Sequence, residues 1–238
     1  MSRILVIGGS GGLGRAVAGA LADRGDAVIV TSRDPGRAEA AAREIGGRAT
    51  GLGVDLAMPE TIAGALTGVD EIDGLVITAI HQDGGSIHAF SVADAVRAVT
   101  VKLVGYAEAV RALRDRFTPH GSVVLFGGSA KDRPYPGSTM VSATNGGVSS
   151  LVRTLAWELA PIRVNALHPG VVLDSPVWRR VPGNPPARTL TGTPITMADI
   201  VDATQFLLRN PAVNALDLHV DGGVRLMDGP VPLQTPGA

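Results

Sequence analysis

The chain has 238 residues, of which 45% are hydrophobic and only 3% aromatic, and its formal net charge at pH 7 is −1. This length suits a single α/β domain over residues 1–238, and the balanced charge gives no electrostatic basis for binding nucleic acid or an anionic membrane. The absence of cysteine excludes disulfides and thiolate catalysis, and no apolar run is long enough to span a bilayer. We therefore expect a cytoplasmic protein.

A strand, a glycine-rich turn and the start of a helix follow one another near the N-terminus. Residues 4–7 are aliphatic, as in a buried parallel strand, residues 8–14 include five glycines, and residues 15–22 show a helical pattern. Without side chains a pyrophosphate can approach the backbone, whose N–H groups at the helix start point at the anion. The pattern predicts a dinucleotide cradle. The competing interpretation is a G-x-S-x-G nucleophile elbow with Ser10 as nucleophile, but that fold needs strands before the elbow.

Strand-like and helix-like segments then alternate along the chain. This rhythm predicts a Rossmann-type doubly wound α/β sheet of about seven mostly parallel strands, with helices on both faces in three layers. Asp34 and Pro35 are typical of a helix start. Further strands are predicted at residues 27–32, 48–54, 74–79, 122–126, 162–167 and 216–220. Helices are predicted at 35–45, from 59 onward, and at 92–117, 138–159 and 197–208. A Pro-, Gly- and Arg-rich loop at about 175–196 is expected to cover the substrate, and the Pro-rich tail 228–238 to cross a partner subunit or fray.

Several ordered motifs resemble those of the short-chain dehydrogenase/reductase family. The spacing Gly8-x3-Gly12-x-Gly14 is similar to the family's glycine loop, and residues 220–223, Val-Asp-Gly-Gly, resemble its usual ending. Asp55 stands where the family has an acid that holds the adenine amino group. The resemblance implies a nicotinamide dinucleotide cofactor. It assigns cofactor binding to Gly8, Ser10, Gly11, Gly12, Leu13, Gly14, Asp55, Leu56, Thr78, Ala79, Asn145, Pro169, Gly170 and Val172.

The end of the second predicted strand favours NADP(H) over NAD(H). NAD-specific folds place an acid there to bind the ribose 2′-hydroxyl, whereas this chain has Ser32 followed by Arg33, with Arg37 one turn into the next helix. A small hydroxyl beside a guanidinium suits a 2′-phosphate. Asp34 is a competing acid, although Asp-Pro is more typical of a helix cap, so NAD(H) stays the alternative.

The catalytic residues of the family are replaced in the register that the flanking motifs set. Its Tyr-x3-Lys pair falls on Val141 and Asn145, its Ser on Gly128, and the Asn of its N-L-x-G motif on Lys102. Ser129 takes the place of Gly128 if the loop is one residue shorter. Valine cannot transfer a proton and asparagine carries no charge, so the usual alcohol–ketone exchange is not expected. We interpret Lys102 as a cation restored near the nicotinamide ribose; the alternative is a surface lysine on an amphipathic helix.

Three side chains are candidates for a substitute proton donor. Tyr135 lies in the loop after the fifth strand, His81 follows the fourth strand with Asp83 nearby, and His168 ends the sixth. For each, a packing role is the alternative. The histidines show no metal-ligand spacing, so no metal site is expected.

We hypothesise an atypical NADP(H)-dependent oxidoreductase that transfers hydride to a small organic substrate such as an imine, an iminium or an activated alkene. Its substrate pocket is predicted from residues 81–85, 128–138 and 175–194, including Trp178. The alternatives are an inactive NAD(P)-binding sensor or partner subunit, and a non-redox isomerase or cyclase. The family resemblance also implies a homo-oligomer, a tetramer or a dimer.

Overall fold

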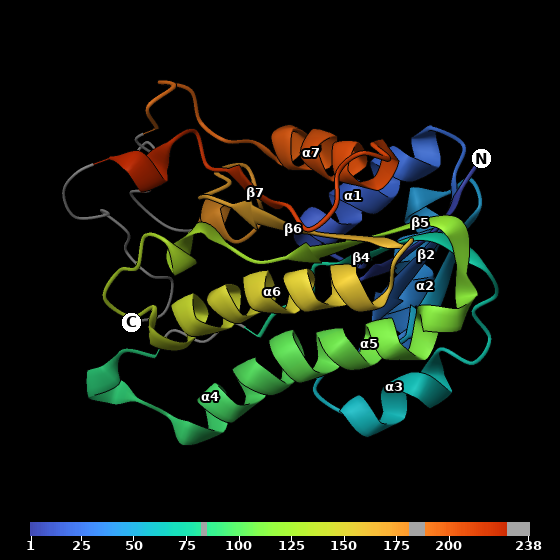
Figure 1. The fold of residues 1–238 in the computed structure, drawn as a ribbon, viewed down its shortest axis with the longest axis horizontal. Helices are drawn as coiled ribbons and strands as arrows, with labels where there is room; N and C mark the ends of the chain where they lie inside the picture. The colour runs from blue at the N-terminus through green and yellow to red at the C-terminus, as the bar shows by residue number, and fades with distance from the viewer. Residues whose placement is uncertain (82–84, 181–188, 228–238) are drawn as a thin grey trace.

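The computed structural model describes residues 1–81, 85–180 and 189–227 (Figure 1). Its strands form one seven-stranded sheet in the order β3-β2-β1-β4-β5-β6-β7, with every neighbouring pair parallel. The strands are β1 (Arg3–Ile7), β2 (Ala27–Ser32), β3 (Ala49–Gly53), β4 (Ile72–Ile77), β5 (Phe117–Phe126), β6 (Arg163–Pro169) and β7 (Asp217–Val220). The α-helices are α1 (Gly12–Asp23), α2 (Pro35–Ile45), α3 (Pro59–Ala65), α4 (Val92–Val99), α5 (Gly105–Leu113), α6 (Thr139–Glu158) and α7 (Met197–Arg209). The predicted Rossmann-type α/β fold is confirmed.

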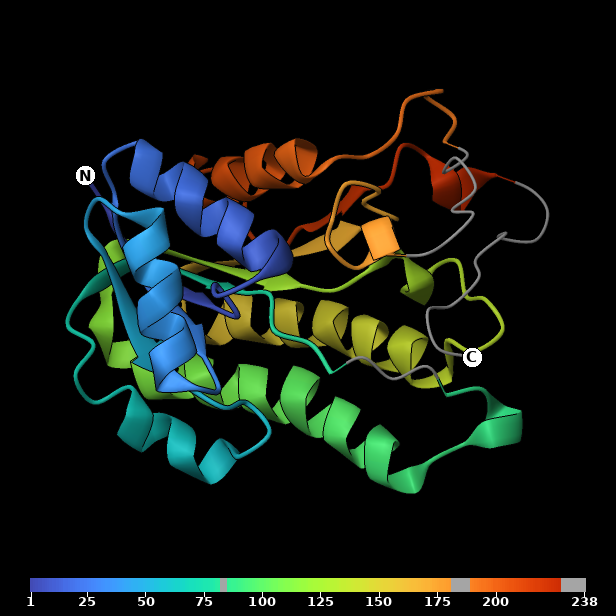
Figure 2. The same ribbon diagram turned by 180° about the vertical axis from the view of Figure 1, so that it is seen from behind.

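The helices cover both faces of the sheet, because the central strands are apolar on both sides (Figures 1 and 2). In β1, Ile4 and Val6 pack in one core cluster with α1, α2 and α7, whereas Leu5 and Ile7 pack in the other with α3, α5 and α6. Successive residues of a strand point to opposite faces, so a continuous aliphatic run serves both layers.

One end of the molecule collects the segments that follow the strands. The short 3-10 turns Ile87–Ala89, Ser129–Lys131 and Val224–Leu226, which follow β4, β5 and β7, lie at the same end in both views (left in Figure 1, right in Figure 2). Ligands of doubly wound sheets bind beyond the carboxyl ends of the strands. The fold therefore directs the search for a site to this edge.

The helical stretch predicted over residues 92–117 is not one α-helix. Between α4 and α5 the chain forms a π-helical segment, Thr100–Val104, and after α5 it tightens into a 3-10 turn, Arg114–Arg116. π-Helical segments often mark functional sites, because the wider turn re-aims a side chain. The apolar periodicity of the sequence shows a helix here but not this local change of pitch.

Strand β5 begins five residues earlier than predicted. Phe117 pairs with Ile72 of β4, and the Thr118 hydroxyl donates to the Asp73 carboxylate at 3.0 Å. The residues that follow include Pro119 and Gly121, which disfavour strands, so only the tertiary pairing shows the extension. Strand β4 likewise begins and ends two residues before the predicted 74–79. In contrast, α2 matches its prediction, and the Asp34 carboxylate caps it by accepting from the Arg37 backbone N–H at 2.6 Å.

A buried arginine joins the sheet to the last helix. The Arg163 guanidinium, on a residue only 8% exposed, donates to the backbone oxygens of Leu207, Leu208 and Val213 at 2.8, 2.7 and 3.2 Å. These carbonyls lie at or beyond the carboxyl end of α7, where helices leave acceptors unpaired and favour a cation. Arg163 thus fixes α7 against β6.

Within the described ranges, no helix combines the length and apolarity needed to cross a membrane.

Replacing Arg163 with Met is expected to lower the free energy of unfolding by about 2 kcal/mol, because three backbone oxygens lose a charged donor. The matched control is Arg43→Met: the Arg43 side chain is 71% exposed and lies 4.0 Å from Glu39, so its loss should cost under about 0.5 kcal/mol. Urea unfolding at equal protein concentration measures both, and equal midpoints would contradict the capping role.

Candidate cofactor and active site

The glycine turn after β1 is packed so tightly that three of its positions, Gly8, Gly9 and Gly14, have no room for a side chain. A β-carbon at Gly14 would lie 2.4 Å from both the Gly8 carbonyl oxygen and the Thr78 hydroxyl. Gly8 itself has φ +87°, and a β-carbon there would lie 2.8 Å from the Ala79 nitrogen. The missing side chains let α1 start directly against the ends of β1 and β4.

The next part of the turn is open instead of packed. A β-carbon at Gly12 would meet no atom within 4 Å, and one at Gly11 would meet only the Arg37 guanidinium at 3.5 Å. Gly11 caps α1 without a side-chain hydrogen bond, so its first-turn N–H groups are not capped by a side chain of the described residues. Ser10 is half-buried in the turn, and Leu13 packs against the α1 side of the core. Open space over free N–H groups at a helix start fits a pyrophosphate.

The expected adenosine end lies beside this turn. Ser32 ends β2, where its hydroxyl accepts from the Asp34 N–H at 3.4 Å, and Arg33 is exposed. The Asp34 carboxylate caps α2 by accepting a hydrogen bond from the Arg37 N–H. The Asp55 carboxylate accepts from the Ala57 N–H at 2.9 Å, which fixes the turn after β3. Leu56 is buried and packs closely against the start of α5, since a β-carbon at Gly105 would lie only 2.6 Å from the Leu56 carbonyl oxygen.

Hydrogen bonds tie together the carboxyl ends of β1, β4 and β5. The Thr78 hydroxyl lies 3.3 Å from the Ile7 oxygen, and the Tyr106 hydroxyl reaches the oxygens of Ala79 at 2.9 Å and Phe126 at 3.3 Å. Tyr106 is fully buried, and burial raises the pKa of its phenol, which therefore stays a donor. The sequence interpretation missed this residue. The signal was available: it is one of two tyrosines in the chain and stands one helical turn after Lys102.

Lys102 and Asn145 approach the same peptide from two helices. The Lys102 ammonium donates to the Gly127 oxygen at 3.3 Å, and the residue is only 7% exposed, so the surface-lysine alternative is wrong. A β-carbon at Gly128 would lie 2.7 Å from the Asn145 side-chain nitrogen. The Asn145 side-chain oxygen is buried without a hydrogen-bond partner in the described part of the chain.

His168 is a structural residue and not a proton donor. It is fully buried; its Nδ1 accepts from the Gly128 N–H at 3.0 Å, and its Nε2 faces Asp217 at 3.1 Å and Ser149 at 3.3 Å. Burial lowers the pKa of His168 to about 4, so the ring is neutral at physiological pH. Because Ser149 and Asp217 share one ring nitrogen, the three do not form a nucleophilic triad.

The other two proton-donor candidates lie on different elements. The Tyr135 backbone N–H donates to the Ser138 hydroxyl at 3.0 Å, and burial raises the pKa of the Tyr135 phenol, which keeps it protonated. His81 Nε2 lies 3.4 Å from the Asp94 carboxylate at the start of α4. Asp83, expected near His81, lies outside the described residues. The catalytic roles of Tyr135 and His81 stay predictions.

Beyond β6, short contacts hold the start of the expected substrate loop. The Ser129 hydroxyl donates to the Pro169 oxygen at 3.1 Å, and Gly170 packs against Ile195. Val172, which is buried, forms an isolated parallel bridge with Ile195. The bridge therefore brings the start of this segment, just after β6, beside its end, just before α7. Of the predicted pocket, residues 82–84 and 181–188 lie outside the described residues, as does the tail 228–238.

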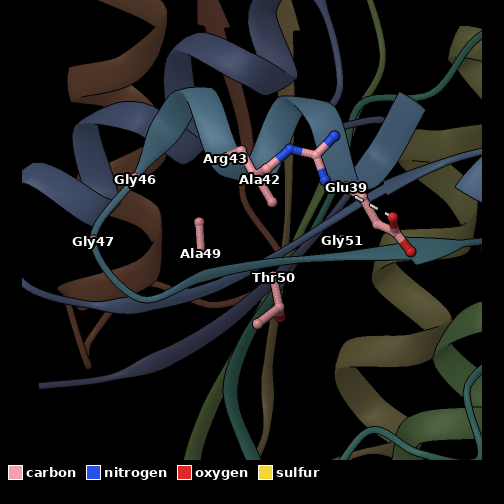
Figure 3. Close-up of a pocket in the computed structure, with 8 residues that line it drawn as sticks. All are labelled: Glu39, Ala42, Arg43, Gly46, Gly47, Ala49, Thr50 and Gly51. Atoms are coloured by element: carbon pink, nitrogen blue, oxygen red, sulfur yellow. Dashed lines mark ion pairs between the residues drawn. The ribbon is translucent and has the colours of Figure 1, made fainter. Parts of the chain in front are cut away.

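A separate surface hollow lies between α2 and β3 (Figure 3). The glycine turn Gly46–Gly47 places it at the amino end of β3, away from the cradle. Its lining residues are Glu39, Ala42, Arg43, Gly46, Gly47, Ala49, Thr50 and Gly51. No group of three or more His, Asp or Glu side chains in the described ranges could hold a metal ion.

A family model described as enoyl-(acyl carrier protein) reductase matches residues 8–225 of the chain. A solved structure titled short chain dehydrogenase/reductase family protein superposes with a TM-score of 0.86 at 29% identity, covering 95% of this chain and 98% of that one. The chain belongs to the short-chain dehydrogenase/reductase family.

Similar members of this family include both reductases and an inactive protein. Carbonyl reductase family member 4 of Danio rerio is 29% identical, over 95% of this chain and 100% of its own. Inactive 2-(S)-hydroxypropyl-CoM dehydrogenase 2 of Xanthobacter autotrophicus is 33% identical, over 84% of this chain and 95% of its own. The structure of 3-ketoacyl-(acyl-carrier-protein) reductase from Brucella melitensis complexed with NADH has a TM-score of 0.83 at 26% identity, covering 93% and 97%.

Gly14→Ala is expected to weaken the binding of a nicotinamide dinucleotide, with NADPH as the probe, at least tenfold and to lower the melting temperature, because the added methyl collides with the Gly8 oxygen and Thr78. Gly19→Ala is the matched control on the same helix, where a β-carbon meets no atom within 4 Å. It should leave both quantities unchanged or raise stability slightly. Nucleotide fluorescence titration and thermal melting measure the pair, and equal NADPH affinity in both variants would refute the packing argument.

Proposed function

We propose that this family member is an NADP(H)-dependent oxidoreductase that reduces a small organic substrate without a Tyr-x3-Lys pair. The observation that carries the proposal is the packed glycine turn, whose open helix start faces the sheet edge that Lys102 also reaches. The reduced nicotinamide supplies a hydride when bound, and the protein supplies binding, orientation and a proton source. The names of the reductase relatives support a redox role.

The contacts of Asn145 support the register on which the altered catalytic set depends. Val141 and Asn145 stand one turn apart on α6, and Asn145 lies close to Gly128, the position that the register gives to the family's serine. In this register the proton cannot come from position 141, because valine has no exchangeable side-chain proton. The Ser129 hydroxyl, the alternative to Gly128, is already bound to Pro169.

The surroundings of the turn support NADP(H). Arg33 is exposed directly after Ser32, and the Arg37 guanidinium would lie 3.5 Å from a β-carbon at Gly11, so two cations are available near the turn for a 2′-phosphate. The acid that would favour NAD(H), Asp34, is used in the α2 cap. We therefore propose NADP(H) as the cofactor, with NAD(H) as the alternative. Separately, we propose that the protein is cytoplasmic.

The test is oxidation of NADPH in the presence of small aldehydes, ketones, cyclic imines and enones, followed by nicotinamide absorbance. We expect turnover with at least one class, and NADPH binding at least tenfold tighter than NADH binding. Ser32→Asp should reverse that preference by placing a carboxylate at the 2′-position, whereas the control Ser32→Ala should keep it. Tight NADPH binding without turnover would replace this proposal with the sensor or partner-subunit alternative, which the inactive relative favours.

We also propose a homo-oligomer, because long helices on one face of the sheet leave apolar side chains in water. Trp157 on α6 is 87% exposed, and Val96 and Val104 on the α4–α5 stretch are 60% and 49% exposed. Sedimentation should show a dimer or tetramer, and Trp157→Glu should shift it toward smaller species while the control Glu60→Gln does not. A monomer at micromolar concentration would overturn the proposal.

A further inference from the structure

A series of hydrogen bonds connects Lys102 to the carboxyl ends of the strands, where ligands of doubly wound sheets bind. Thr78 joins the glycine turn to the end of β4, Tyr106 joins Ala79 to Phe126 at the end of β5, and Lys102 bonds to the next residue, Gly127. The π-helical segment carries Lys102, and Tyr106 follows it by one turn. The ammonium therefore lies at the carboxyl end of β5, where Tyr106 joins β5 to the end of β4.

No fixed charge of the described residues compensates this ammonium. Burial lowers the pKa of the Lys102 ammonium from its usual value to about 8. The charged or titratable groups on the packed elements are Glu60 on α3, Asp94 and Arg97 on α4, Tyr106, Glu108 and Arg111 on α5, Arg153 and Glu158 on α6, and His168 behind Gly128. Glu108 is paired with Arg111, Asp94 with His81, and Arg153 with Asp217.

A second polar group faces the same peptide without a partner. The Asn145 side-chain oxygen is a buried acceptor with no hydrogen bond in the described part of the chain, although buried polar groups normally have one. Gly128, between the two side chains, contributes no side chain of its own. An ammonium donor at the Gly127 oxygen and a free amide acceptor beside Gly128 fit a ligand that carries both an acceptor and a donor, such as a carbonyl beside a ribose hydroxyl.

We propose that Lys102 is the acid of the reaction and gives its proton to the oxygen of an uncharged carbonyl substrate. The inference rests on the proposed function. The carbonyl carbon gains a hydride as the reduced nicotinamide is oxidised, the electron pair of the carbonyl π bond moves to oxygen, and that oxygen takes a proton from the Lys102 ammonium. Lys102 is left as a neutral amine, which water protonates again. A buried cation at this place disfavours an iminium substrate, so neutral substrates are preferred.

The chain offers a direct test because it contains only two lysines, Lys102 and Lys131. Expression with isotope-labelled lysine gives two side-chain NMR signals, and Lys131→Arg assigns them. We expect the Lys102 signal to titrate near pH 8 in the free protein. Saturating NADP+ should lower that pKa by about one unit relative to NADPH, because only the oxidised nicotinamide carries a positive ring. The Lys131 signal, whose ammonium lies 3.0 Å from Asp132, should respond equally to both forms.

A Lys102 pKa near 10.5, or one that is the same with NADP+ and NADPH, would overturn the inference and leave the proposed function intact. If neither NADP+ nor NADPH binds, both the inference and the proposed function are overturned. A kinetic comparison with ethyl acetoacetate and 2-cyclohexenone separates proton donation from charge alone. Lys102→Arg keeps the charge but cannot release a proton, so we expect it to lose about 10²–10⁴-fold in kcat, and we expect the same loss for Lys102→Met. Recovery of kcat in Lys102→Arg would show that only the charge matters, and would refute the acid role.

Discussion

The tight contact between Gly14, Gly8 and Thr78 is the constraint on which the site depends. It lets α1 begin against the ends of β1 and β4, and that position leaves the first-turn N–H groups open beside Gly11 and Gly12. A single added methyl group would separate the helix from the strands. At Gly8 and Gly14 the glycine turn and the packing of the sheet depend on the same contacts, so a larger side chain at either position changes both.

From the carboxyl ends of the strands, a chain of hydrogen bonds runs to β7, the last strand and one edge of the sheet. The Gly127–Gly128 peptide is held by Lys102 on one side and by His168 on the other, and His168 is fixed in turn by Asp217 on β7. Only a neutral imidazole with its proton on Nε2 can accept from Gly128 and donate to Asp217 at once. The imidazole of His168 thereby links the position of β7 to the geometry of the Gly127–Gly128 peptide.

Patterns that depend on local chemistry could be predicted from the sequence. The aliphatic strand, the glycine turn, and the Asp34-Pro35 start of α2 each specify structure within a few residues, and all three are confirmed. Tertiary contacts decided the rest. The early start of β5 depends on pairing with β4, the burial of His168 on strands and helices distant in sequence, and the contacts of Lys102 on a local π-helical turn. For the proposed proton donor the sequence offered only candidates, because tertiary packing decides which groups a loop side chain reaches.

The bridge between Val172 and Ile195 has an evolutionary consequence. It brings together the two ends of the segment that leaves β6 and returns before α7, while Arg163 independently anchors the far end of α7. The closure entropy of a loop grows only slowly with its length, so insertions or deletions between these two points cost little stability. Loops vary more than the elements they connect, so the length of this segment can change while the glycine turn and the sheet stay the same.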